Sequence, residues 1–356
     1  MPQQSPFTPP PTVADRSLST ALTRDAGIEI PLICGAMYPC SNPELVAAVS
    51  EAGGIGIVQP LSLVYVHGHA FEDGMRLLSS LTDKPIGLNV IVEKSSKVYE
   101  DRMKRYVDEA IEHGVRFFVT SLGDPRWVVE KAHAVGGKVY HDVTARKWAE
   151  RAVRSEVDGL IAVNARAGGH AGDRSLADLL EDLSDLGPPV VAAGGVGAAA
   201  DFVEALRLGY AGVQMGTRFI ATDECSAHED YKQAVVDSDE DDIVLTERLT
   251  GVPVAVIRTP HIERIGLKAG PIARRMLRGR RTKHWMRMWY SLQSLWRLKK
   301  SLHRSYSSKD FMQAGRSVAG VESIEPAGEI VRRFAAAARR DLADSAPAAR
   351  AVRAAV

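Results

Sequence analysis

The feature that most constrains the fold is a regular alternation, between about residues 30 and 220, of short apolar runs with longer segments of helical period. Short runs bounded by Gly, Pro, Asn and Asp predict strands, and the apolar spacing between them predicts helices. The predicted strands cover 31–35, 54–58, 86–92, 117–121, 138–143, 160–164, 190–194 and 213–216. The predicted helices cover 42–52, 72–81, 101–113, 125–136, 145–155, 175–183 and 199–208.

Strict alternation of strands and helices implies a parallel sheet, and eight strands in this length favour a closed barrel. An open doubly wound sheet is the alternative. Its GxGxxG fingerprint, with an acidic residue about 20 positions later, does not follow the first strand. We therefore predict an α/β fold, a (β/α)8 TIM barrel with an additional, mainly helical C-terminal segment.

Four segments are predicted along the chain. Residues 1–16 are rich in proline with little apolar periodicity, which predicts a disordered leader. Residues 17–235 form the barrel. Residues 236–325 are predicted to be a basic, helical insertion that could serve as a lid or substrate domain, and residues 326–356 a C-terminal helix packing on the barrel.

The stretch 264–304 interleaves arginine and lysine with tryptophan, leucine and methionine. This pattern is typical of amphipathic helices whose basic side chains cover apolar surface. Contact with a membrane surface or a nucleic acid is an alternative, and it would make the chain an interaction protein.

Charge and cysteine content exclude several classes of protein. The chain has 45 Lys and Arg against 44 Asp and Glu, so its net charge of +1 gives no overall attraction to nucleic acid. No apolar run approaches the roughly 20 residues that span a bilayer, and the N-terminus does not resemble a signal peptide. Three cysteines without CxxC spacing indicate reduced thiols and no metal site. We expect a cytoplasmic enzyme of a small-molecule substrate, with no nucleic-acid partner and no integral membrane segment; a homodimer is compatible with the sequence.

Three glycines surround one histidine in the run 167–172, directly after the sixth predicted strand. Such a loop lets the backbone approach a flat ligand closely, and His170 is its one side chain that titrates near neutral pH. An active-site loop is the favoured interpretation, with a glycine-rich turn carrying an incidental histidine as the alternative.

Glycines also follow the seventh and eighth strands, where barrels of this type commonly bind phosphate. Gly194 and Gly195 lead into a helix whose N-terminus could face an anion. After the eighth strand come a backbone amide, a hydroxyl and a guanidinium, from Gln214, Met215, Gly216, Thr217 and Arg218. Each segment alone could be only a tight turn, but together they favour a phosphate site.

Two other strand ends add compatible groups. Ala36 and Met37 close the first strand with a small side chain and a thioether that could pack on an aromatic ring. Asn89 is a polar amide in an apolar strand, and it could bind either a heterocycle or a neighbouring backbone group. Together the strand ends indicate a cleft for a flat, phosphorylated heteroaromatic cofactor, which points to FMN; a phosphosugar-binding barrel could use the same two glycine loops.

These residues resemble the nitronate monooxygenases, formerly called 2-nitropropane dioxygenases, and the related FMN-dependent enoyl-ACP reductases. The resemblance runs from about Pro31 to Tyr231, with a weaker similarity at 313–315. Its motifs are Gly35-Ala36-Met37, the run 43–56, Gly87-Leu88-Asn89, the run 167–172, Ala193-Gly194-Gly195-Val196 and the run 214–219. The segment 227–232 looks particularly like the reductase branch.

The resemblance implies a flavin barrel in which His170 is catalytic. It implies an FMN site made of Ala36, Met37, Asn89, Gly168, Gly169, Gly194, Gly195, Gln214, Met215, Gly216 and Thr217. In nitronate monooxygenases the matching histidine would take a proton from a nitroalkane, after which the nitronate reduces FMN and oxygen completes the reaction. The alternative is an FMN reductase that uses NAD(P)H as co-substrate to reduce enoyl thioesters or quinones.

The chain departs from the family at four positions. Arg166 and Val163 stand where Glu and Gln are usual, Asp142 where many members carry Lys, and Arg316 where Gln often follows Ala-Gly. Arg166 could lower the pKa of His170 or bind an anionic group of the substrate. We therefore assign Arg166 and His170 to the substrate site.

Overall fold

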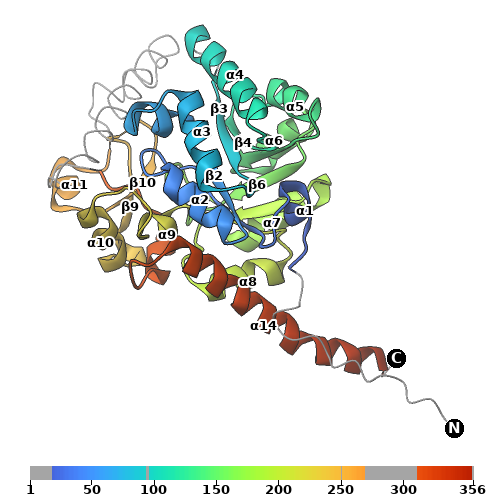
Figure 1. Cartoon of the computed structure of the whole chain (residues 1–356). Helices are drawn as coiled ribbons and strands as arrows, with labels where there is room; N and C mark the ends of the chain where they lie inside the picture. The colour runs from blue at the N-terminus through green and yellow to red at the C-terminus, as the bar shows by residue number, and fades with distance from the viewer. Residues whose placement is uncertain (1–17, 94–95, 250, 269–310, 355–356) are drawn as a thin grey trace.

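The computed structural model describes residues 18–93, 96–249, 251–268 and 311–354 (Figure 1). Eight parallel strands form a closed barrel in which each strand pairs with the next and β8 pairs with β1. The strands are β1 Leu32–Cys34, β2 Ile55–Val58, β3 Gly87–Val92, β4 Phe117–Leu122, β5 Lys138–Val143, β6 Gly159–Val163, β7 Val190–Ala193 and β8 Val213–Met215. The predicted (β/α)8 barrel is confirmed.

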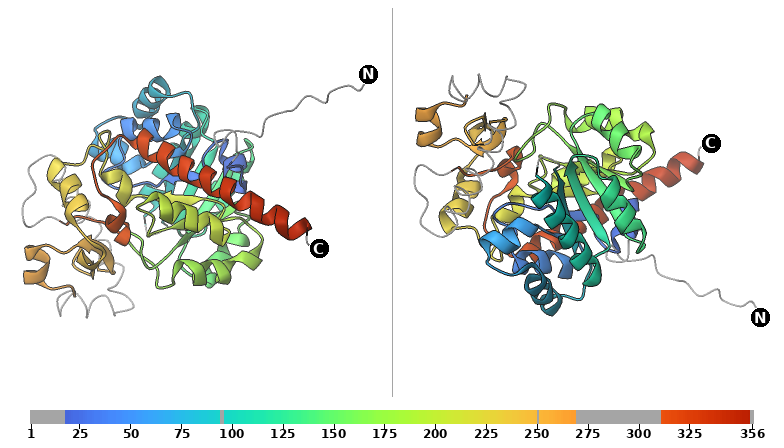
Figure 2. Two further views of the ribbon diagram at one scale, coloured as in Figure 1. Left: turned by 90° about the horizontal axis from the view of Figure 1, so that it is seen from below. Right: turned by 90° about the horizontal axis from the view of Figure 1, so that it is seen from above.

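Helices alternate with the strands along the chain and surround the barrel, as the two views of Figure 2 show from below and from above. They are α1 Ala21–Ala26, which precedes β1, and then α2 Pro43–Glu51, α3 Phe71–Leu81, α4 Lys97–Glu112, α5 Arg126–His133, α6 Arg146–Val153, α7 Leu176–Leu183 and α8 Ala199–Leu208. Each of the seven helices predicted between strands is found, within a few residues of its expected ends.

The two faces of the barrel strands bury different sets of side chains. Along each strand, alternate residues point into the barrel or outward under the helices. The inward set includes Ile33, Ile57, Phe117, Tyr140 and Ile161, with the rings of Phe117 and Tyr140 5.0 Å apart. Burial on both faces explains why the strands are apolar runs without polar alternation.

The start of helix α2 is fixed both by its local sequence and by tertiary contacts. Pro43 occupies the first turn, where its missing N–H costs nothing. Asn42 stands at the N-cap, but its side chain does not cap the helix. Its Nδ2 donates to the Glu224 carbonyl at 2.8 Å, and its Oδ1 accepts from the Ser226 N–H at 3.1 Å. Asn42 therefore fixes a loop that follows β8.

After the barrel the chain forms α9 Thr217–Ile220, α10 Glu229–Asp237, the antiparallel strands β9 Ile243–Thr246 and β10 Val254–Ile257, and α11 Pro260–Ile265. These elements, apart from α9, gather at one end of the molecule (Figures 1 and 2). The hairpin of β9 and β10 was not predicted in the segment 236–325, which was expected to be helical. Most of the basic stretch 264–304, like the predicted leader 1–16, lies outside the described residues.

The chain ends in the long helix α14 Ala327–Ala354, which packs against α8 and α2 and extends past the barrel (Figure 1). Phe334 of α14 is fully buried, and its ring lies 5.9 Å from that of Phe202 in α8. Arg218, also buried, forms an ion pair with Glu325 just before α14. The additional helical C-terminal segment of the predicted fold is present.

Candidate active site

Polar side chains point into the barrel from three strands, and two of them, Asp142 and Gln214, lie next to the last residue at the carboxyl end of their strands. Asn89 of β3, Asp142 of β5 and Gln214 of β8 lie on the inward face, since their neighbours along each strand pack in the outer core. Active sites of (β/α)8 barrels lie at this end. We call this end the mouth.

Two predicted cofactor residues meet across the junction of β1 and β8. A Cβ placed on Gly216 would lie 3.4 Å from the Met37 Sδ, so the thioether rests on the glycine backbone. A Cβ on Gly35 would lie only 2.9 Å from the Gln214 Cγ. The Met37 N–H donates to the Ser41 hydroxyl at 2.8 Å, which fixes the loop. Small residues here let two strand ends approach closely.

The loop that carries His170 is held by the hairpin. Gly169 has a φ of +68°, a conformation that favours glycine, and its carbonyl accepts the Ala255 N–H of β10 at 2.8 Å. The His170 residue is exposed at the mouth, yet surrounding protein desolvates the ring enough to lower its pKa below the ordinary value. The lowered pKa favours the neutral form of the imidazole near pH 7.

Gly168 packs against Ala314 and Gly315, in the segment that begins at residue 311. A Cβ on Gly168 would lie 3.0 Å from the Gly315 nitrogen and 3.4 Å from the Thr217 Oγ1. The Gly315 N–H donates to that hydroxyl at 2.9 Å. The loops after β6 and β8 thus meet through residue 315, which lies in the motif 313–315 that the sequence indicated only weakly.

Asn164 organises the loops after β6 and β7, a role that sequence reasoning missed. It is 1% exposed; its Nδ2 donates to the Gly194 carbonyl at 2.9 Å, and its Oδ1 accepts the Arg166 N–H at 2.8 Å. Gly194 and Gly195 have φ values of +110° and +80°. The sequence did offer one signal for this role, because Asn164 is a polar residue directly after the apolar run of β6.

Arg166 lies over the second of these glycines. A Cβ on Gly195 would come within 3.1 Å of the Arg166 Cδ. The guanidinium forms an ion pair with Glu240 at 2.8 Å, and Arg316 lies 3.7 Å from the other oxygen of the same carboxylate. Glu240 belongs to a short helical turn, η4 Glu240–Asp242, before the hairpin.

Two groups that were expected to bind an anion, the N-terminus of α8 and the Arg218 guanidinium, are bonded to other groups of the protein. At the N-terminus of α8, the N–H groups of Gly197 and Ala198 both donate to Asp201, at 2.9 and 2.8 Å. The Arg218 guanidinium donates to the carbonyls of Ala221 and Ser323 and pairs with Glu325. An anion at the mouth must therefore rely on the glycine loops and on other cations.

Asp142 and Gln214 leave buried oxygens unsatisfied. Within the described part of the chain, Oδ1 of Asp142 and Oε1 of Gln214 have no hydrogen-bond partner. Burial raises the pKa of Asp142 to about 7, with the nearby Gln214 amide acting in the opposite direction. Such groups are normally satisfied in the working protein, so they fit a ligand that brings hydrogen-bonding atoms, such as a flavin.

The predicted site residues occupy several different places in the structure. The structure brings Gly168, Gly194, Gly195 and Thr217 to one side of the mouth, and Met37, Gln214 and Gly216 to another. Asn89 faces the barrel interior, and Ala36 packs against the inner core. The Met215 side chain instead points into the outer core, and its carbonyl accepts the Gly35 N–H. Gly169 and His170 lie on the loop held by the hairpin.

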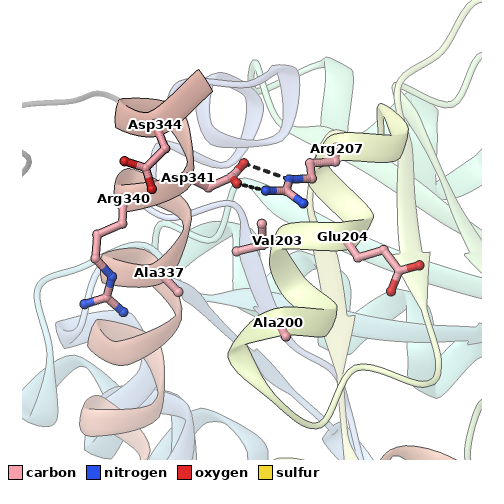
Figure 3. Close-up of a pocket in the computed structure, with 8 residues that line it drawn as sticks. All are labelled: Ala200, Val203, Glu204, Arg207, Ala337, Arg340, Asp341 and Asp344. Carbon is pink, nitrogen blue, oxygen red and sulfur yellow. Dashed lines mark hydrogen bonds and ion pairs between the residues drawn. The ribbon is translucent and has the colours of Figure 1, made fainter. Parts of the chain in front are cut away.

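A separate groove of about 380 Å³ lies between α8 and α14, on the outer layer of helices (Figure 3). Arg207 and Asp341 form an ion pair across it. The groove is lined by helix surfaces and not by strand ends, so it is not part of the mouth. Among the described residues, no cluster could hold a metal ion, and no helix has the length and apolarity to cross a membrane.

Comparison with known families agrees with the geometry of the mouth. The sequence profile described as nitronate monooxygenase matches residues 19–336, which cover the whole barrel. The chain belongs to the nitronate monooxygenase family. It is therefore an enzyme, an oxidoreductase of a family whose members use FMN.

Two relatives within this family have different described activities. A probable nitronate monooxygenase of Staphylococcus saprophyticus is 31% identical, over 70% of this chain and 81% of its own length. A Rhodococcus jostii protein described as (3aS,4S,5R,7aS)-5-hydroxy-7a-methyl-1-oxo-octahydro-1H-indene-4-carboxyl-CoA dehydrogenase is 30% identical, over 68% of this chain and 67% of its own. Family membership alone therefore does not determine the substrate.

Solved structures give the same fold. FabK from Thermotoga maritima matches with a TM-score of 0.75 and 27% identity, over 92% of this chain and 99% of its own. Nitroalkane oxidase from Streptomyces ansochromogenes has a TM-score of 0.70 at 24% identity, over 91% and 99%, and supports the fold alone.

Proposed function

We propose that this chain binds FMN at the mouth and oxidises alkyl nitronates, with His170 as the group that moves the proton beside the reacting carbon. The observation that carries the proposal is the convergence of the glycine loops and the unsatisfied oxygens of Asp142 and Gln214 on the carboxyl end of the barrel. When bound, the flavin would supply the redox step.

Different loops would contact different parts of such a cofactor. The phosphate would lie against the glycine backbone after β7, where Gly195 has a positive φ. Gln214 and Asp142 would face the polar edge of the ring, and Met37 would contribute a soft apolar contact. Each of these residues binds or orients the cofactor and excludes water; none has to react.

His170 would act as a general base toward a neutral nitroalkane. Its pKa lies below the ordinary value because of desolvation, which favours near pH 7 the neutral imidazole that can accept the proton. Acidification through that pKa should abolish proton abstraction, whereas a preformed nitronate should not need it.

A second candidate is an NAD(P)H-dependent reductase of enoyl thioesters or quinones. The observation that favours it is the pair of cations, Arg166 and Arg316, where an anionic carrier could bind at the rim of the mouth. The carboxyl-CoA dehydrogenase relative supports a thioester in particular.

Anaerobic titration separates the two candidates. The purified protein should absorb near 450 nm, as expected for bound flavin. Bleaching by a nitronate alone supports the monooxygenase, and rapid bleaching by NADH or NADPH supports the reductase. A colourless protein that does not take up added FMN would refute both.

A further inference from the structure

We propose that Arg166 and Arg316 form a clamp for a phosphate monoester at the rim of the mouth, and that Glu240 occupies the clamp until the phosphate binds. The inference deepens the proposed function, because the phosphate would belong either to the flavin or to a phosphorylated carrier of the substrate. The chemistry of recognition is the same in both cases.

The geometry of the carboxylate supports an anion site. Glu240 presents one oxygen to each arginine, at 2.8 Å to Arg166 and 3.7 Å to Arg316. Guanidinium groups recognise phosphate and carboxylate oxygens through the same hydrogen-bond pattern. The carboxylate therefore marks a position where two cations converge on one anion.

The charge of the cluster favours replacement of Glu240. Two arginines against one carboxylate leave a net charge of +1, which a phosphate dianion would offset better than the carboxylate does. All three side chains are partly exposed, at 44% for Arg166, 49% for Arg316 and 36% for Glu240. Partial exposure keeps the ion pair weak enough to exchange.

The backbone beside the clamp supplies a second, independent observation. The Arg166 side chain lies over Gly195, whose φ is +80°. Among the described residues, the N–H groups of Gly195 and Val196 make no hydrogen bond. Adjacent backbone N–H groups without partners, close to a basic side chain, are a feature of phosphate-binding loops.

The two arginines are also fixed relative to each other. The Arg316 N–H donates to the Arg166 carbonyl at 3.0 Å, so the loops that carry them are paired. A Cβ on Gly315 would lie 2.8 Å from the same carbonyl, which shows how closely the backbones approach. The clamp is built from two loops held in one arrangement.

Equilibrium binding tests the clamp without relying on turnover. Apoprotein is titrated with FMN and with riboflavin, which lacks the phosphate, by quenching of flavin fluorescence. The protein as purified is titrated with coenzyme A and with pantetheine, which also lacks phosphate, by calorimetry. The variants are Arg166→Ala, Arg316→Ala and Glu240→Gln. The control is Arg174→Ala, since Arg174 is equally exposed at 44% and ion-paired with Asp182.

Loss of a charge-assisted contact should weaken binding about 10- to 100-fold. If the phosphate is the flavin's, the two arginine variants lose affinity for FMN and not for riboflavin. If it is the carrier's, they lose affinity for coenzyme A and not for pantetheine. Glu240→Gln should tighten whichever phosphorylated ligand is bound. The proposal is overturned if Arg166→Ala and Arg316→Ala show the same ratio of FMN to riboflavin affinity as Arg174→Ala, and also the same ratio of coenzyme A to pantetheine affinity. Failure of the apoprotein to bind either flavin would count against the proposed function and leave the coenzyme A titration as the test of the clamp.

Discussion

Replacing Asp142 with asparagine should stabilise the apoprotein, and increasingly so as the pH rises. Burial raises the pKa of this carboxyl from 3.8 to about 7, so the folded state holds a proton that the unfolded state has lost. Stability from this group is complete below the unfolded pKa and falls through the interval up to pH 7. Asparagine keeps a similar shape and never ionises.

The size of the effect follows from the shift. A change from 3.8 to about 7 corresponds to at most about 4 kcal/mol. The residue as a whole retains some solvent contact, although its Oδ1 has none. We therefore expect Asp142→Asn to gain about 2–4 kcal/mol relative to the wild type between pH 4 and pH 8.

Urea denaturation of both apoproteins across that pH range measures the difference in the free energy of unfolding. Other titrating groups cancel in the difference between variant and wild type. Glu181→Gln, which removes an exposed carboxylate on α7, controls for the loss of one negative charge. A difference between Asp142→Asn and wild type that does not vary with pH would refute the buried, neutral carboxyl.

Four further substitutions test the site and the fold. His170→Ala should keep FMN absorbance near 450 nm and lose about 10²–10⁴-fold in turnover with a neutral nitroalkane; full activity would contradict its role. Gly195→Val should deplete bound FMN, whereas Gly187→Val, equally strained at a φ of +101° but with open space around it, should not. Asn164→Ala should lower FMN affinity, because the Gly194 carbonyl and the Arg166 N–H lose their partner; unchanged affinity would contradict a positioning role. Phe334→Ala should cost about 3–5 kcal/mol in chemical denaturation, since the ring is fully buried.

The barrel could be predicted from sequence because its signal is local. Each strand is buried on both faces and so reads as an apolar run, and some helices begin or end at proline or glycine, as α2 does at Pro43 and α8 at Gly209. The strand count then placed the glycine loops in order around the mouth. The positions of Gly168, Gly195 and Gln214 follow from that order alone.

The hairpin of β9 and β10 was missed although its strands carry a local signal. The runs 243–246 and 254–257 are rich in valine and isoleucine and are separated by Gly251 and Pro253. They are only four residues long and lie between an acidic run and a basic one, so the charges dominated the interpretation of this segment.

A single sequence carries no signal for contacts between loops that lie far apart along the chain. Arg166 meets Glu240 across 74 positions, and Thr217 meets Gly315 across 98. Pairing of this kind depends on where the barrel places each loop. The orientation of Arg218 depends likewise on Glu325, 107 positions away, which a motif-based assignment to phosphate could not anticipate.

Hydrogen bonds join the segment after the barrel to the loop that carries His170. β10 donates the Ala255 N–H to Gly169, next to His170, and the Ile257 N–H to Met312. The same hairpin follows the turn that carries Glu240, the carboxylate that occupies the arginine clamp. Displacement of Glu240 by a phosphate would therefore act on an element that also holds the histidine loop. Changes in the hairpin would therefore act on the histidine loop and on the arginine clamp together, whereas the glycines after β7 and β8 belong to the barrel itself.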